Sequence, residues 1–355
     1  MKTKYVLTAA LLALLSACNG DDDDDDDDEA STTRMVVFGD NYSDMGTYAV
    51  GAVAEAGGGK FTINGDGERL WVQTVASALG VSEGVCAAQT GLQGDASLGY
   101  SVPVENHDEC FNYAQGGARV TEPIGFRNAA LGDPLGALTV PVNQQIDHFL
   151  SVHGSFQPDD TVFVYAGIND ILWNLDSIAN DELTEDAAYA AVEAAAAELG
   201  EEINTIMANG AQKVVVFGLP DVSLTPELWL SGIKAQEVAN VMVRRFNNVL
   251  YNGTVSKLNE VLWISLFYES QAQFEDPASY GLTNVEQVAC NLDPEVNPLE
   301  SVLICTDATL QPDADPGSYL WAGTLHMTPY GQSLMASQVI DRLMDRGWAA
   351  ELSAE

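Results

Sequence analysis

The stretch MVVFGDNYSDMG, residues 35–46, is the starting point for the fold. Four apolar residues, 35–38, predict a buried strand, and Gly39-Asp40 follow with residue types that favour a turn. Three more apolar runs of strand length occur at residues 161–165, 213–217 and 261–266. Longer helical patterns separate these runs, so the sequence predicts an α/β protein built from βαβ units around a parallel sheet.

Five segments carry helical periodicity. They are residues 69–79, 142–152, 185–208, 235–258 and 329–346. Thr184 is the expected N-cap of the third helix, and Gly210 is expected just beyond its end. No fixed-period repeat and no second break in composition occur, so we expect one domain over residues 35–349.

The charge of the chain is strongly acidic. It has 52 Asp and Glu against 14 Lys and Arg, which gives a net charge of −38. Nucleic-acid binding needs clustered Lys and Arg, so DNA and RNA are excluded as expected partners. A soluble, monomeric protein in a salty exterior is the simplest interpretation of such a surface.

The N-terminus predicts export. Lys2 and Lys4 precede an apolar run at residues 5–17, which is too short to span a bilayer and is typical of a secretory signal. Leu-Ser-Ala-Cys, ending at Cys18, resembles the lipobox of bacterial lipoproteins, in which the cysteine is lipidated. We therefore expect a signal peptide over residues 1–18 and a membrane anchor at Cys18, in the cell envelope on the outer membrane or cell surface. Secretion after cleavage is the alternative.

Eight consecutive aspartates, residues 21–28, lie within the segment 19–34 that follows the lipobox. Such a run repels itself and stays extended, so it predicts a tether between the membrane and the domain. A calcium-binding tail is the alternative, although a run of this kind has no fixed ligand geometry.

Four further cysteines form an even set for an oxidising compartment. Among their three pairings, Cys86–Cys110 with Cys290–Cys305 is the simplest, because each bridge would close a loop rich in Gly, Asp or Pro. Each would stabilise the fold by about 3 kcal/mol in the chain-entropy description. Metal ligation is disfavoured because no CxxC and no suitably spaced histidine are present. No cofactor motif occurs, so we expect no cofactor.

Chemistry in open parallel sheets gathers at the carboxyl ends of the strands. Gly39-Asp40-Asn41-Tyr42-Ser43-Asp44 follows the first strand, and Gly167-Ile168-Asn169-Asp170 follows the next one. A segment with the sequence NYAQGG ends at Gly116-Gly117, and His326 precedes the last helix within the sequence LHMTPYG.

In this order and spacing the four segments resemble the blocks of the SGNH/GDSL hydrolases, a family of lipases and esterases with a flavodoxin-like, three-layer α/β/α fold. The resemblance covers essentially the whole mature domain. It implies an oxyanion hole formed by the backbone N–H at position 41, Gly116 and Asn169, with His326 as the general base. It also implies a serine nucleophile at position 41 and an aspartate three residues before the histidine.

The chain departs from the family at both of those last two positions, which hold Asn41 and Gly323. An amide nitrogen whose lone pair is delocalised is not activated by a base as a serine hydroxyl is. We therefore expect a strongly impaired or inactive hydrolase that binds an ester, an acyl chain or a glycan.

The alternative is an active carboxylester hydrolase with a rearranged site. Ser43 could act as a displaced nucleophile, although it is expected rather to cap a following helix. Asp313 or Asp315 could orient His326, or His326 could activate a water molecule directly. Fold alone does not choose between these classes of function.

Overall fold

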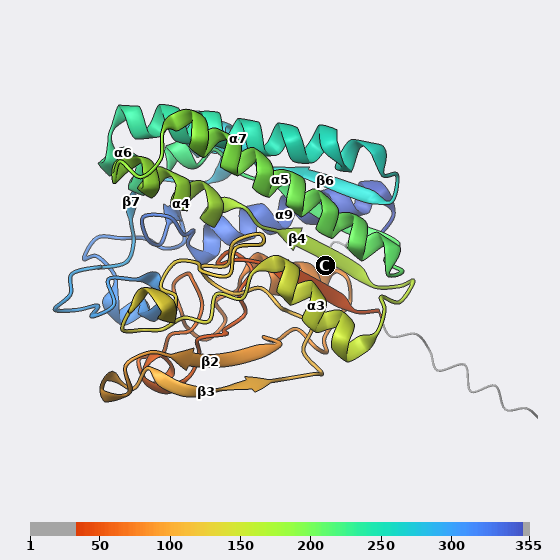
Figure 1. The fold of residues 1–355 in the computed structure, drawn as a ribbon. Coiled ribbons are helices and arrows are strands. Elements are labelled where there is room, and N and C mark those ends of the chain that lie inside the picture. The colour runs from red at the N-terminus through yellow and green to blue at the C-terminus, as the bar shows by residue number, and fades with distance from the viewer. Residues whose placement is uncertain (1–32, 351–355) are drawn as a thin grey trace, which may run out of the picture. The chain divides into compact units, whose positions relative to one another are not determined.

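Four parallel strands form the central sheet of the computed structural model, which describes residues 33–350 (Figure 1). The predicted signal peptide, Cys18 and most of the acidic tether lie outside the described residues. The spatial order of the strands is β1-β4-β5-β6. Their bounds are Met35–Gly39 for β1, Thr161–Tyr165 for β4, Lys213–Gly218 for β5 and Val261–Ser265 for β6. All four predicted strands are confirmed, with ends that differ by at most one residue.

Nine α-helices occur within residues 33–350. They are α1 Gly51–Glu55, α2 Trp71–Ala78, α3 Val142–His153, α4 Ile168–Ala179, α5 Glu185–Ala208, α6 Pro226–Ser231, α7 Ile233–Gly253, α8 Leu266–Glu275 and α9 Pro329–Arg346.

The bounds of α5 and α9 agree with the sequence prediction. Thr184 caps α5 by accepting a hydrogen bond from the Ala187 N–H, as expected. Helix α7 starts two residues before the prediction and ends five residues before the predicted end at 258. The reason is that Thr254 leaves the helical conformation, with φ −133°, and the next residues form a separate short turn.

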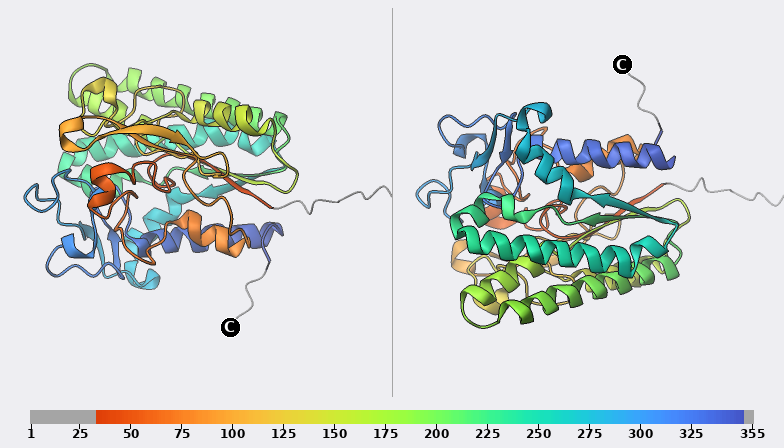
Figure 2. Two further views of the ribbon diagram at one scale, coloured as in Figure 1. Left: turned by 90° about the horizontal axis from the view of Figure 1, so that it is seen from below. Right: turned by 90° about the horizontal axis from the view of Figure 1, so that it is seen from above.

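Helices cover both faces of the sheet. One layer contains α3, α4, α5 and α7, in which α5 contacts the other three helices, and the other layer contains α2, α8 and α9 (Figure 2). The strands between them are almost completely buried, which explains their continuous apolar runs. The three-layer α/β/α fold that the sequence predicts is therefore confirmed.

A fifth segment extends the sheet beside β1. The Val37 N–H donates to the Phe111 carbonyl, and the N–H groups of Tyr113 and Gln115 donate to the carbonyls of Val37 and Gly39. Residues 111–115 thus run parallel to β1, although the sequence did not predict a strand there. This pairing brings the Gly116-Gly117 turn to the end of β1, beside Asn41.

Two small sheets lie outside the central one, and neither was predicted. Strands β2, Gln89–Gln93, and β3, Ser101–Asn106, form an antiparallel pair, while β7, Asn284–Val288, and β8, Tyr319–Trp321, are parallel. Their residues are mixed in polarity and partly exposed, so they carry no continuous apolar run. Because β8 leads into the His326 loop, the second pair helps to place that histidine.

Both predicted disulfides, Cys86–Cys110 and Cys290–Cys305, are present. The second bridge belongs to a separate apolar cluster beside the sheet, which also contains Val302 and Phe61. The loop that it closes contributes Ser301 and Val302 to the wall of a large pocket. This bridge therefore holds one side of the candidate site.

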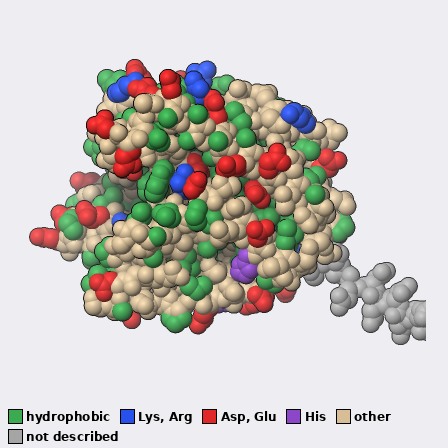
Figure 3. Space-filling view, viewed as in Figure 1, with side chains coloured by type: hydrophobic (Ala, Val, Ile, Leu, Met, Phe, Trp, Pro, Cys, Tyr) green, Lys and Arg blue, Asp and Glu red, His purple; other side chains and the backbone are tan. Residues whose placement is uncertain are grey.

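Acidic side chains are spread over the visible face of the molecule and are not gathered in one patch (Figure 3). Among the described residues, no helix combines the length and apolar character needed to cross a bilayer.

Candidate functional site

The turn after β1 is held by the buried carboxylate of Asp44. One carboxylate oxygen, Oδ1, accepts hydrogen bonds from the N–H groups of Gly46 at 2.9 Å and Thr47 at 2.8 Å. Its Oδ2 accepts from the Gly116 N–H at 2.8 Å. Asp44 thereby ties the turn after β1 to the turn after the neighbouring segment 111–115.

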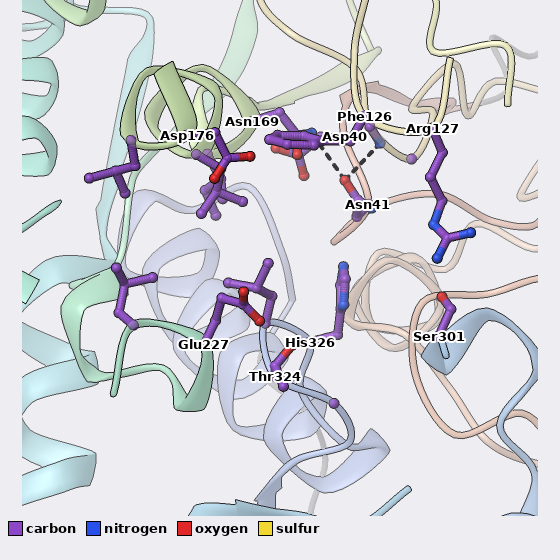
Figure 4. Close-up of a pocket in the computed structure, with 18 of the residues that line it drawn as sticks. Asp40, Asn41, Phe126, Arg127, Asn169, Asp176, Glu227, Ser301, Thr324 and His326 are labelled. Atoms are coloured by element: carbon purple, nitrogen blue, oxygen red, sulfur yellow. Dashed lines mark hydrogen bonds between the residues drawn. The ribbon is translucent and has the colours of Figure 1, made fainter. Parts of the chain in front are cut away.

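The side chain of Asn41 faces two hydrogen-bond donors (Figure 4). Its Oδ1 accepts from the Gly117 N–H at 2.8 Å and from Nδ2 of Asn169 at 3.0 Å. Asn169 lies in the first turn of α4, and its Nδ2 also donates to the Ala118 carbonyl. Two preorganised donors converging on one oxygen are the arrangement that stabilises an oxyanion in acyl transfer. Here that oxygen belongs to Asn41 itself.

The backbone donor in this arrangement differs from the residue that the family resemblance assigns. The Gly116 N–H is committed to Asp44, whereas the Gly117 N–H points to Asn41. Gly117 has φ +82°, and a Cβ atom there would approach the Phe126 carbonyl oxygen to 2.5 Å. A glycine is therefore needed at 117 to present this N–H. The donor position thus moves from Gly116 to Gly117.

His326 lies opposite Asn41, and in Figure 4 its ring points toward that residue. The ring packs between two aromatic side chains, with centroid distances of 5.9 Å to Tyr42 and 5.2 Å to Phe61. Burial lowers the pKa of His326 from 6.5 to about 4. A neighbouring carboxylate would raise that pKa, but within the part of the chain that the structure describes none offsets the effect of burial.

Gly323, at the position where the family resemblance predicts an aspartate, lies on the same short loop as His326. The N–H groups of Ala322 and Gly323 both donate to the carbonyl of His326. A Cβ atom at Gly323 would meet Cγ1 of Val302 at 2.4 Å. The loop therefore brings position 323 close to the histidine backbone, but Val302 fills the space into which an aspartate side chain would begin.

Neither aspartate considered as a replacement takes over the orienting role. Asp315 accepts hydrogen bonds from Ser318 Oγ at 2.6 Å and from the Gly317 N–H at 3.0 Å. Asp313 lines a different pocket, together with Thr324. Among residues 33–350, no carboxylate influences the His326 ring strongly enough to shift its pKa.

Ser43 does not line the large pocket either. Its hydroxyl is fully buried and has no hydrogen-bond partner within the described chain. The expectation that Ser43 caps a following helix is wrong, because Asp44 accepts the N–H groups of that turn and the next helix begins only at Gly51.

The pocket in front of these residues has a volume of about 700 Å³. Asn41, Asn169 and His326 lie at its centre (Figure 4). One end, called the apolar chamber below, lies between three helices and is lined by Leu172, Leu175 and Ile178 from α4, Leu228 from α6, and Ala235 and Val238 from α7. Three charged residues of the same helices, Asp176, Glu227 and Lys234, also line the pocket. The sequence interpretation missed this chamber, although the apolar spacing of 168, 171, 172, 175 and 178 could have predicted α4.

Three buried carboxyl groups surround the turn after β1. Burial is the largest cause that raises the pKa of Asp40 to about 7, and repulsion from Asp170 and Asp44 adds to it. Burial also raises the pKa values of Asp44 and Asp170 to about 6, although hydrogen bonds and Arg119 lower them. Oδ2 of Asp40 has no hydrogen-bond partner among the described residues.

The shifts predict that the folded state loses stability as the pH rises. Raised carboxyl pKa values mean that the folded state binds more protons than the unfolded state between about pH 4 and 7, so the free energy of unfolding falls over that range. His326 opposes this between its folded pKa of about 4 and its ordinary value of 6.5. The combined effect of the three carboxyl groups on the free energy of unfolding is larger than the opposite effect of His326, so stability should fall as the pH rises.

Replacing Asp40 with Asn should remove the largest part of this dependence. We expect the variant to be more stable than the natural protein at about pH 8, by an amount on the order of 4 kcal/mol, and to show a flatter pH profile. Urea unfolding at about pH 5 and pH 8 measures the difference. Asp159→Asn, at an exposed carboxyl, is the control. Equal slopes for Asp40→Asn and the natural protein would contradict the prediction.

Two comparisons relate this chain to known proteins. A model of the family described as GDSL-like lipase/acylhydrolase matches residues 35–339. The phosphatidylcholine-sterol acyltransferase of Aeromonas hydrophila is 27% identical over 178 residues, which cover 48% of this chain and 47% of that protein. The chain thus matches about half the length of this curated relative.

Proposed function

Because the chain belongs to the GDSL-like lipase/acylhydrolase family, we propose that it keeps the family's pocket as a binding site for an acyl-bearing lipid or ester and has lost rapid ester hydrolysis. The observation that carries this proposal is the side chain of Asn41. It stands at the nucleophile position, and its Oδ1 accepts from the two donors that an ester carbonyl would need.

The occupied donors weaken the alternative of an active hydrolase. If His326 activated a water molecule, the resulting oxyanion would still need stabilisation, and removing a single donor of this kind reduces turnover by about 10²–10³. Here both donors are already bound to Asn41. Ser43 is buried outside the pocket, so it offers no replacement nucleophile.

Hydrolysis of p-nitrophenyl butyrate and palmitate tests the loss of activity. We expect the natural protein and His326→Ala to hydrolyse both esters equally slowly, because the Gly117 and Asn169 donors that an ester oxyanion would need are occupied by the Asn41 side chain. A turnover in the natural protein that falls by about 10²-fold or more in His326→Ala would contradict the proposal, since that is the contribution of a working general base.

The apolar chamber supports a ligand with an acyl chain. Its lining residues come from helices on one face of the sheet, and Leu172, Leu175, Ile178 and Ala235 are only partly buried, so they leave apolar surface in the pocket that also holds Asn41. The relative from Aeromonas hydrophila is named for acyl transfer from phosphatidylcholine to a sterol. A chain of methylene groups matches such a surface, because each buried methylene contributes about 0.8 kcal/mol.

Leu175→Trp should shorten the chamber and select against long acyl chains. Excluding about four methylene groups would weaken binding by about 3 kcal/mol, or roughly 100-fold. Displacement of a fluorescent fatty acid by long and short acyl esters measures this, and short esters should bind unchanged. Leu131→Trp is the control, because Leu131 is 55% exposed and does not line the pocket. If Leu175→Trp weakened the binding of long and short esters equally, the acyl chain would not bind in the apolar chamber.

We also propose that the protein is exported and anchored through Cys18, as the lipobox-like sequence supports. Expression in a bacterial host should incorporate a labelled fatty acid and place the protein in the membrane fraction. Cys18→Ser should abolish both. Labelling that persists in Cys18→Ser would show that Cys18 is not the lipidated residue.

A further inference from the structure

The side-chain amide of Asn41 is held like the reacting carbonyl of a hydrolase substrate. Its oxygen accepts from the Gly117 N–H at 2.8 Å and from Asn169 Nδ2 at 3.0 Å. Both donors withdraw electron density from the amide carbon. They are also placed to stabilise negative charge that develops on Oδ1 when a nucleophile adds to that carbon.

A base and a route for water lie on the other side of this amide. Asn41 is only partly buried and faces the pocket of about 700 Å³. The ring of His326 points toward it across that pocket (Figure 4). Burial lowers the pKa of His326 to about 4, so the ring is neutral near pH 7 and can accept a proton.

We propose that Asn41 is a self-modification site, at which water activated by His326 hydrolyses the side-chain amide to an aspartate. A water O–H bond breaks, its proton moves to a ring nitrogen of His326, and the oxygen forms a bond to Cγ of Asn41. The resulting oxyanion accepts from Gly117 and Asn169. The C–N bond then breaks as the imidazolium gives its proton to the departing nitrogen. Ammonia and a carboxyl group are the products, and His326 is regenerated.

The ordinary route of asparagine deamidation is hindered at this position. That route requires the next backbone nitrogen, of Tyr42, to attack the side chain and form a succinimide. The Tyr42 N–H instead donates to Oδ1 of Asp40 at 3.2 Å, and Tyr42 is only 4% exposed. A succinimide opens to both aspartate and isoaspartate, whereas direct attack by water yields aspartate alone. The two routes therefore differ in their products.

Peptide mapping by mass spectrometry tests the proposal with the full chain. The protein is incubated near neutral pH in water enriched in heavy oxygen, and the state of residue 41 is followed over time. Asn252, which is exposed and precedes Gly253, is an internal reference for the succinimide route. We expect Asn41 to gain one heavy oxygen and to form aspartate without isoaspartate.

Two variants distinguish hydrolysis assisted by His326 from spontaneous deamidation. His326→Ala should slow the conversion of Asn41 by about 10²–10⁴-fold. Asn169→Ala should slow it by about 10²–10³-fold. In both variants the reference at Asn252 should keep its rate, which shows that the fold is intact. Isoaspartate at position 41, an amide that persists while Asn252 converts, or an unchanged rate in His326→Ala would overturn the proposal.

This inference uses the site of the proposed function but does not depend on ligand binding. Its readout is the chemical state of residue 41, whereas the proposed function is tested with added esters and fatty acids. A protein that binds acyl ligands and keeps its Asn41 amide would overturn this inference alone.

Discussion

Asn41→Ser should raise the turnover of short p-nitrophenyl esters by about 100-fold. In a hydrolase with the full triad, loss of the serine lowers turnover by about 10⁶ and loss of the aspartate by about 10⁴. A variant with a serine and His326 but without the aspartate should therefore recover the difference between these losses. The structure adds a second reason, because removing the Asn41 amide frees the Gly117 and Asn169 donors for the ester carbonyl.

Asn41→Ala distinguishes the contribution of the serine nucleophile from that of the freed Gly117 and Asn169 donors. It frees the same donors without supplying a nucleophile, so any gain in its turnover measures the contribution of the freed donors, and its turnover should stay below that of Asn41→Ser. A serine-directed phosphonate should label Asn41→Ser at residue 41 and should not label Asn41→Ala. If the two variants hydrolyse esters equally, position 41 is not the nucleophile position of this site.

Gly323→Asp should raise turnover further, by up to about 10⁴-fold, in a chain that already carries Asn41→Ser and Val302→Ala. The Val302 substitution is needed because a Cβ atom at position 323 would lie 2.4 Å from Cγ1 of Val302. Without it, the new side chain must displace a residue that is only 2% exposed. A variant that carries only Asn41→Ser and Gly323→Asp should therefore hydrolyse esters more slowly than the variant that also carries Val302→Ala.

The pH profile provides an independent readout of the new aspartate. A carboxylate beside His326 favours the charged ring and should raise the pKa, which burial now lowers to about 4. The acidic limb of the kcat profile should therefore move to higher pH. Gly323→Asn is the matched control, because it has nearly the same size without the charge. If Asp and Asn give the same turnover and the same acidic limb, the carboxylate does not orient His326.

Local sequence patterns predicted the centre of the fold well. The apolar runs at β1, β4, β5 and β6 are long enough to be recognised as strands, and β1, β4 and nearly all of β5 are buried on both faces. Helices α5 and α9 were predicted within their actual bounds from their periodicity, and for α5 also from the expected cap Thr184; the structure shows that Thr328 caps α9 in the same way. The disulfide pairing followed from the short separation of the cysteines.

Contacts between distant segments were not predictable in the same way. Residues 111–115 pair with β1 through hydrogen bonds that depend on tertiary placement and leave no strong local pattern. The apolar chamber arises where α4, α6 and α7 meet, so no single segment contains its signature. Val302 is far from Gly323 in the sequence, and only the fold shows that it fills the aspartate position.

The sequence by itself determined that position 41 follows the first strand and holds Asn, and that position 323 holds Gly. Residue identities and their order along the chain are enough for that conclusion. Only the tertiary structure decided what the Asn41 amide does. Its oxygen accepts from a backbone N–H 76 residues away and from a side chain 128 residues away, at 2.8 and 3.0 Å. Hydrogen bonds depend on distances of a few tenths of an ångström, and folding alone brings such remote groups into register.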